Sequence, residues 1–162
     1  MSAPARFLAL LRRALPLSIA ALLVACTITP PPPDMLILTP TPVPDGNVAQ
    51  YRLAVAHRIA ERNPSRILHG TPQAMLRSLV VVSFTVDRVG HVIHASVYRS
   101  NGDDEAESIA LATLHAAAPL PPPPSRLLDG RGELEMMECW LFNDNGQFQL
   151  RTTAVAQAQT LD

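Results

Sequence analysis

The sequence predicts an α+β fold: a three-stranded antiparallel sheet with two helices packed on one face, in the order α-β-β-α-β. Three observations lead to this prediction. Residues 47–63 carry an apolar stripe with helical spacing, and Leu79–Val86 is a short β-branched run that returns after a turn. An Ala-rich helical segment then precedes an alternating strand at Leu134–Phe142. Because the helices do not alternate regularly with the strands, α+β layers are favoured over parallel βαβ units.

The first helix is predicted between a cap at Asn47 or Asp45 and a stop at Asn63-Pro64. A single stripe of apolar residues recurs with helical spacing, at Val48, Tyr51, Val55 and Ile59. This stripe predicts an amphipathic helix that packs on the sheet.

A β-hairpin is predicted next. Leu79–Val86 has the β-branched composition of a central strand. The turn Asp87-Arg88-Val89-Gly90 supplies an Asp to start it and a Gly for positive φ, and Val92–Tyr98 is the returning strand. Ser100-Asn101-Gly102 then breaks that strand.

The second helix is predicted to begin at Asp104-Glu105-Ala106-Glu107. We interpret this run as a capping box in which Asp104 accepts a hydrogen bond from the backbone near Glu107. The helix stops at Ala118-Pro119, and the prolines of residues 119–124 keep the next segment extended.

The last strand alternates along its length. Leu134, Met136, Trp140 and Phe142 share one face, and Glu135, Met137, Cys139 and Leu141 share the other. After the turn at residues 143–146, Gln147–Thr153 is expected to pair briefly. Residues 151–162 are predicted to be a loose polar tail.

The N-terminus has the pattern of a bacterial lipoprotein signal peptide over residues 1–25. Arg6, Arg12 and Arg13 form a positive region, and the apolar run Ala14–Val24 is shorter than the ~20 residues that span a bilayer. The run ends in Leu23-Val24-Ala25-Cys26, which predicts cleavage after Ala25 and lipidation of Cys26, palmitate included. Thr27 in place of Asp favours the outer membrane over the inner.

Residues 26–46 are predicted to be the lipidated cysteine and a Pro-rich tether. The prolines are Pro30, Pro31, Pro32, Pro33, Pro40, Pro42 and Pro44. Such a run favours polyproline II, and at ~3.1 Å per residue it reaches at most about 70 Å. The sequence therefore predicts a membrane-anchored domain that faces the periplasm.

Composition argues against several function classes. Without residues 1–25, 10 Arg stand against 14 Asp and Glu, a net charge of -4 that disfavours nucleic-acid binding. The sequence has no nucleophile elbow and no Gly-rich phosphate loop, and its five histidines are isolated in the chain or on opposite faces of a strand. We therefore expect no enzyme activity, no metal and no cofactor. Cys139, left without a partner, is expected to be buried.

The hairpin resembles that of the TonB C-terminal domain family. Residues 82–92, Val-Ser-Phe-Thr-Val-Asp-Arg-Val-Gly-His-Val, are similar to the family pattern V-x-F-x-V-D-x-x-G-x-V. Ser100-Asn101-Gly102 resembles the following S-x-G, the Ala-rich second helix resembles its counterpart, and Ala118–Pro124 is similar to the stretch A-P-F-P-P-P. The resemblance covers roughly Tyr51–Phe142, within a TonB or TolA C-terminal-like domain at residues 47–150.

The resemblance implies a periplasmic module that takes part in transmembrane transport by binding outer-membrane transporters. In the family, the last strand is an edge that adds an extended partner peptide to the sheet, which is β-augmentation. Carried over, partner binding falls on Leu134, Glu135, Met136, Met137, Glu138, Cys139 and Leu141. The same edge could pair with a second copy, which predicts a homodimer as an alternative.

Two departures separate this chain from energy transducers of the family. The chain has a lipidation motif in place of an uncleaved transmembrane helix, and its tether is short. A further difference is that Asn63-Pro64 replaces the family's Tyr-Pro pair. Two other interpretations therefore stay open. One is a structural or assembly lipoprotein of the outer membrane, whose last strand is covered by the tail. The other is an inter-membrane tether similar to the TolA C-terminal domain.

Overall fold

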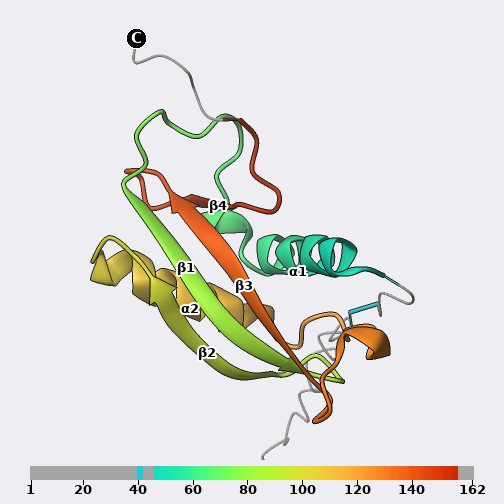
Figure 1. Cartoon of the computed structure of the whole chain (residues 1–162). Helices are drawn as coiled ribbons and strands as arrows, with labels where there is room; N and C mark the ends of the chain where they lie inside the picture. Colours follow the sequence, from blue (N-terminus) through green and yellow to red (C-terminus); the bar gives the residue numbers. More distant parts are fainter. Residues whose placement is uncertain (1–39, 42–45, 157–162) are drawn as a thin grey trace, which may run out of the picture. The chain divides into compact units, whose positions relative to one another are not determined.

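The computed structural model describes residues 40–41 and 46–156 (Figure 1). The elements in chain order are α1 (Val48–Arg62), the 3-10 helix η1 (Pro64–Arg66), β1 (Ser78–Asp87), β2 (Val92–Arg99), α2 (Asp104–Ala117), the 3-10 helix η2 (Ser125–Leu127), β3 (Glu133–Phe142) and β4 (Phe148–Leu150). The predicted α+β class is confirmed.

The sheet has four antiparallel strands in the order β2-β1-β3-β4, so the prediction of three strands was wrong. The additional strand, β4, is only three residues long. It follows the turn at residues 143–146, where the Asn143 N–H donates to the Gln147 carbonyl at 2.9 Å. The sequence predicts brief pairing at Gln147–Thr153. Three residues are too few to show the alternation of apolar and polar side chains that identifies a strand, so β4 was not predicted as one.

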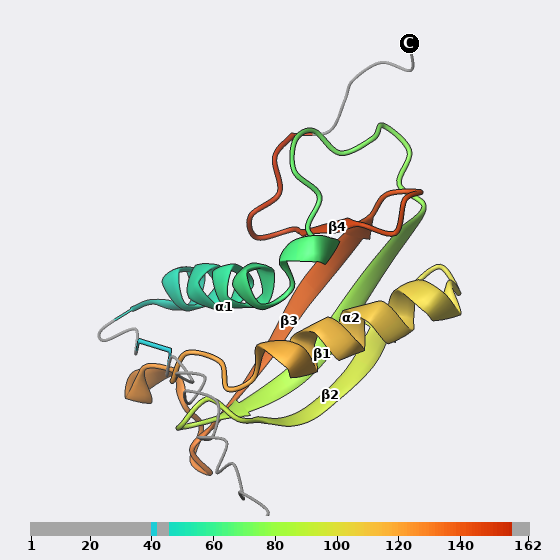
Figure 2. The ribbon, with the colours of Figure 1, turned by 180° about the vertical axis from the view of Figure 1, so that it is seen from behind.

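The core lies between one face of the sheet and the two helices. In β1 every second residue is buried, from Ser78 to Val86, and the residues between them are exposed or half-buried. Figure 1 shows α2 crossing behind β1 and β2, and Figure 2, seen from behind, shows α2 in front of them. The opposite face, which we call the outer face, is not covered by either helix.

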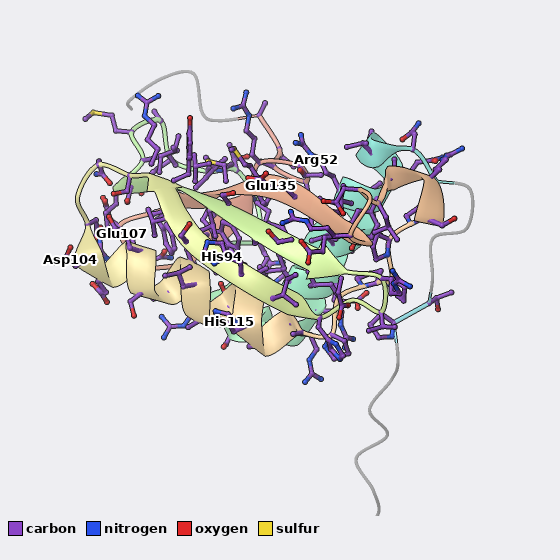
Figure 3. The ribbon with its side chains drawn as sticks, turned by 60° about the horizontal axis from the view of Figure 1, so that its bottom comes forward. Arg52, His94, Asp104, Glu107, His115 and Glu135 are labelled. Atoms are coloured by element: carbon purple, nitrogen blue, oxygen red, sulfur yellow. The ribbon has the colours of Figure 1, made fainter. Side chains whose placement is uncertain are left out.

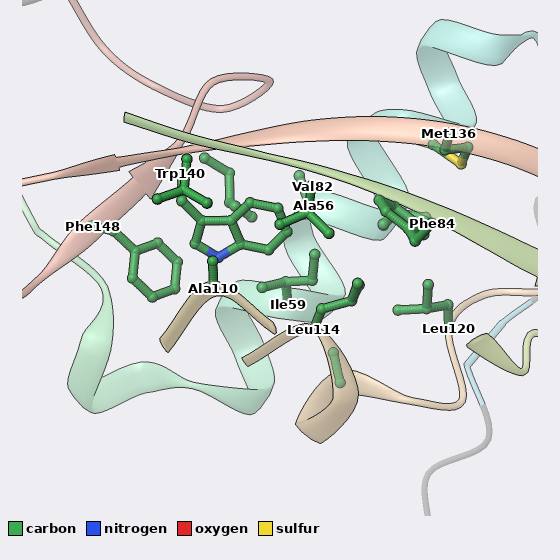
Figure 4. Packing of buried hydrophobic residues seen from close by; sticks show 14 of the residues in the cluster. Ala56, Ile59, Val82, Phe84, Ala110, Leu114, Leu120, Met136, Trp140 and Phe148 are labelled. Carbon is green, nitrogen blue, oxygen red and sulfur yellow. The ribbon is translucent and has the colours of Figure 1, made fainter. Parts of the chain in front are cut away.

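Aromatic side chains of the last two strands fill the core at one end (Figure 4). Trp140 and Phe148 are fully buried, with ring centroids 6.4 Å apart. The indole Nε1–H of Trp140 donates to Thr113 Oγ1 on α2 at 3.1 Å, so its one polar atom is satisfied. Burying these rings explains why β4 forms despite its length.

Helix α1 begins at the predicted cap. The Asn47 side chain accepts from the Gln50 N–H and the Gln50 side chain accepts from the Asn47 N–H, both at 2.9 Å, which is a capping box. The helix ends at Asn63, as predicted. Tyr51, Val55 and Ile59 are buried as expected, but Val48 is 44% exposed.

The C-terminus of α2 is held by side chains at the end of α1. Arg58 Nε donates to the Ala117 carbonyl at 3.2 Å and Arg62 Nε to the Ala116 carbonyl at 3.4 Å. These two carbonyls belong to the last turn of the helix, where the backbone lacks partners of its own. The C-cap of α1, Asn63, adds a bond from Nδ2 to the Thr113 carbonyl at 3.0 Å, one turn earlier. Two cations at the negative end of the dipole therefore join the two helices.

The N-cap of α2 is Asp103, so the prediction of a capping box at Asp104 was wrong by one residue. Asp103 accepts from the Ala106 N–H at 3.1 Å and also pairs with Arg77 at 2.9 Å. Glu107, three positions after Asp104, favours Asp104 as the cap in sequence, but the ion pair of Asp103 with Arg77, 26 positions earlier, favours Asp103 in the structure.

The hairpin turn is built as predicted. Asp87 Oδ1 accepts from the N–H groups of Val89 and His91, at 2.9 and 2.8 Å. Gly90 adopts a φ of 95°, and its carbonyl accepts from the Leu120 N–H at 2.8 Å. The Pro-rich segment after α2 is therefore held against this turn.

The signal peptide, Cys26 and nearly all of the tether lie outside the described residues. Within residues 40–41 and 46–156, no helix is long and apolar enough to cross a membrane.

Candidate protein-binding edge of the sheet

Strand β3 is paired along its whole length on one side and along a short part on the other. On one side, each residue of Glu133–Phe142 lies opposite a residue of β1. On the other side, β4 pairs only with Trp140, Leu141 and Phe142. The prediction that Leu134–Leu141 is an edge is therefore corrected at Trp140 and Leu141, which lie opposite Leu150 and Gln149 and are internal to the sheet.

The direction of the backbone groups along β3 follows from two hydrogen bonds. The Phe142 carbonyl accepts from the Arg77 N–H, on the β1 side, and the Cys139 carbonyl accepts from the Arg151 N–H, on the opposite side. Because successive residues of a strand alternate in direction, Glu135 and Met137 point their N–H and C=O groups away from β1. Among the described residues, no strand pairs with them there.

We call the part of β3 whose outward backbone groups have no strand partner the open window. Hydrogen bonds close it at both ends. Toward the start of β3, the Glu133 carbonyl accepts from the Asp129 N–H at 2.8 Å, and the Glu133 N–H donates to the Asp129 carboxylate at 2.9 Å. Toward the end, the Glu138 carboxylate accepts from the Cys139 N–H at 2.9 Å and binds the Thr152 N–H and hydroxyl. The window thus consists of the backbone groups of Glu135 and Met137.

The predicted partner-binding residues divide into three groups. Glu135 and Met137 are exposed on the outer face beside the open window. Leu134 and Met136 face the core, Leu134 half-buried and Met136 buried. Glu138 and Cys139 are buried, and Leu141 is half-buried. A partner that adds as a strand would therefore contact the backbone of β3 together with two of the seven predicted side chains.

Cys139 is buried, as predicted. Burial, together with the nearby Glu138 carboxylate, raises the pKa of its thiol to about 11. The thiol is therefore protonated at neutral pH, and a thiolate nucleophile is not available.

The other edge of the sheet, on β2, is irregular. The register between β1 and β2 shifts twice and leaves Tyr98 and Ile93 as extra residues, exposed by 67% and 50%. Bulges of this kind twist an edge away from regular pairing. They favour β3 over β2 as the edge that accepts a strand.

Two arginines that no sequence pattern singles out lie near the candidate edge. Arg52 of α1 and Arg151, after β4, line a groove with Met137 and Cys139. Figure 3 shows Arg52 and Glu135 on the side of the molecule away from Asp104, Glu107 and His115 of α2. No sequence signal marks Arg151, because its position depends on how β4 pairs.

The histidines form no metal centre. His91 Nδ1 lies 3.0 Å from Asp87 Oδ2 in the hairpin turn, a contact that the turn itself explains. Within the part of the chain that the structure describes, no group of three His, Cys, Asp or Glu side chains is placed to hold a metal ion.

In comparisons with known proteins, no family model, no curated protein and no solved structure matches the chain.

Proposed function

We propose that this chain is a lipoprotein, anchored in a membrane through Cys26 and facing the periplasm, whose folded domain binds other proteins by strand addition to β3. Its partners are outer-membrane transporters or other periplasmic proteins, and the outer membrane is the favoured location. The observation that carries the proposal is the open window at Glu135 and Met137, because unpaired strand groups beside a regular ladder are a template for another strand.

The surroundings of the window support this proposal. The β1–β3 ladder is regular over ten pairs, so β3 presents an edge that no bulge interrupts. Met137, 38% exposed, offers an apolar contact beside the backbone groups. A partner strand would begin at the window and could lengthen its pairing by displacing Arg151 and Thr152 from Cys139 and Glu138.

One experiment tests strand addition directly. Amide hydrogen exchange of the purified chain is measured with and without purified outer-membrane transporters. We expect protection of the Glu135 and Met137 amides on addition of the transporter, and no change in β1. Unchanged exchange along β3 at saturating transporter would contradict strand addition.

A matched pair of variants separates backbone from side-chain binding. Met137→Pro removes the N–H that points away from β1, whereas Met137→Ala keeps it. We expect Met137→Pro to abolish transporter binding and Met137→Ala to weaken it only a few-fold. Circular dichroism of both variants checks that the sheet is intact.

A structural or assembly role in the outer membrane is the second candidate. It is favoured by the contacts of Arg151 with Cys139 and of Thr152 with Glu138, which close part of the edge with the chain's own tail. In that case the amides of Glu135 and Met137 exchange at the same rate with and without a transporter. Glu138→Gln weakens the contact of Thr152 with β3, and the variant still does not bind a transporter.

A further inference from the structure

Two adjoining grooves cross the outer face of the sheet. Both grooves are lined by Val81, Cys139 and Arg151. Arg52, Met137 and Glu138 line only the first groove. Leu79, Arg99 and Asn101 line only the second. We call the combined feature the transverse groove, since it runs across the strands rather than along β3.

Four residues of the transverse groove form one row across the strands. Arg99 lies opposite Val81, Val81 lies opposite Cys139, and the Arg151 N–H donates to the Cys139 carbonyl at 2.9 Å. Adjacent strands are ~4.8 Å apart, so the two arginines of this row are separated by about 14 Å. Two apolar side chains thus lie between two guanidinium groups.

The guanidinium groups along the groove have no partners in the described part of the chain. Arg77 and Arg131 are both in ion pairs with carboxylates, but Arg52, Arg99 and Arg151 make no side-chain hydrogen bond or ion pair within residues 40–41 and 46–156. The acid that lines the groove, Glu138, is occupied by Thr152 and the Cys139 N–H. Three cations therefore face solvent beside an apolar floor.

The other end of the outer face carries three carboxylates, of which Glu133 is in an ion pair with Arg131 and Asp87 lies beside His91. Asp87, Glu133 and Glu135 occupy the same alternating positions of β1 and β3 as Val81 and Cys139, farther along the strands. A flat anionic bilayer pressed on this face would meet these carboxylates as well as the arginines. The charge distribution therefore favours a narrow acidic ligand that covers only the arginine end.

We propose that the transverse groove binds an extended acidic segment of a partner protein, with acidic residues at positions i and i+4 and an apolar residue at i+2. In an extended chain these three side chains point the same way, and the outer two are about 13.5 Å apart, which matches the spacing of Arg99 and Arg151. The carboxylates would pair with the two guanidiniums, and the apolar residue would lie on Val81. This proposal does not depend on strand addition at Glu135 and Met137.

The test uses the purified full chain and a fluorescein-labelled nine-residue threonine peptide with two glutamates four residues apart and a leucine midway. A second peptide has its glutamates three residues apart. By fluorescence anisotropy at low salt, we expect the first peptide to bind at least tenfold more tightly than the second. We expect Arg99→Gln with Arg151→Gln to lower its affinity at least tenfold. Arg66→Gln, on an exposed residue away from the groove, is the matched control and leaves the affinity unchanged.

Three outcomes would overturn the proposal. Equal binding of both peptides would contradict the four-residue spacing. Binding to phosphatidylglycerol vesicles that needs the two arginines, without peptide binding, would assign the groove to a membrane. A dimer that the same double variant dissociates would assign it to a second copy. The variant Glu135→Pro separates this test from the test of strand addition. It removes a backbone N–H of the open window but no residue that lines the groove. We therefore expect it to leave the affinity for the acidic peptide unchanged.

Discussion

Gly90 shows how a single residue sets the position of a distant segment. A Cβ at this position would lie 2.0 Å from the carbonyl oxygen of Leu120, and the backbone φ is positive. Any side chain would therefore have to push away the Pro-rich segment that covers the core beside the hairpin. The glycine that the turn motif requires is thus required by a long-range packing contact as well.

We expect Gly90→Ala to lower the free energy of unfolding by more than Gly102→Ala. Gly102 has a φ of 84°, and a Cβ added there would meet no atom within 4 Å, so its alanine variant carries only the left-handed backbone cost of about 1–2 kcal/mol. Gly90→Ala adds the collision with Leu120. Urea unfolding of both variants measures the difference, and equal losses would contradict the close approach.

A second residue-scale prediction concerns Asp103 and pH. The Ala106 N–H and the Arg77 guanidinium hold the pKa of Asp103 below its usual range, against a smaller opposing effect of desolvation. Because the folded pKa is the lower one, the stabilisation is complete above the unfolded pKa of about 3.9 and is lost as pH falls through the folded value.

Asp103→Asn is therefore expected to lower the urea midpoint at pH 7, and the difference from the native chain should narrow below about pH 4. Asp104→Asn is the matched control, since Asp104 is exposed and is not the cap. A larger effect at Asp104 than at Asp103 would contradict the contacts of the Asp103 carboxylate with Arg77 and the Ala106 N–H.

At the scale of elements, α1 and α2 are joined by capping as well as by apolar packing. Arg58, although cationic, is only 8% exposed, and burial lowers the pKa of its guanidinium. Its hydrogen bond to Ala117 compensates for part of that burial by satisfying a helix-terminal carbonyl. The apolar stripe that predicts α1 does not include Arg58, and the local pattern gives no sign that the end of α2 lies beside it.

We expect Arg58→Met to destabilise the domain by roughly 1–3 kcal/mol, since the Ala117 carbonyl loses its charged donor while its surroundings stay buried. Arg66→Met, on an exposed arginine of η1, should change stability by less than about 0.5 kcal/mol. Thermal and urea unfolding of both variants measure these losses, and equal effects would show that α2 needs no cap from α1.

For the whole molecule, the proposed anchor gives a prediction independent of the folded domain. Cys26→Ser should shift the chain from the membrane pellet to the soluble fraction after cell fractionation, because lipid attachment requires the thiol. Mass spectrometry of the native chain should show cleavage before Cys26 and acylation of that residue. Membrane retention of the Cys26→Ser chain would remove the basis for the lipoprotein proposal.

Local rules in the sequence determined much of this fold. Periodicity, caps and turn residues predicted both main helices, the hairpin and β3, because each depends on residues within a few positions of one another. The burial of Cys139 was predicted on a different ground, its lack of a partner cysteine. The local rules misplaced the cap of α2 by one residue, since a second acid lay beside it.

Only the tertiary structure decided where β3 is open and where it is closed. Leu141 and Cys139 alternate in sequence just as Glu135 and Met137 do, yet β4 and Arg151 cover the first two and leave the others free. Likewise, Arg99 and Arg151 are far apart in the chain, and strand pairing places them along one groove, to which α1 adds Arg52. The physical reason is the same in both cases: edges and charge clusters are set by which strands pair, a long-range choice that local patterns do not encode.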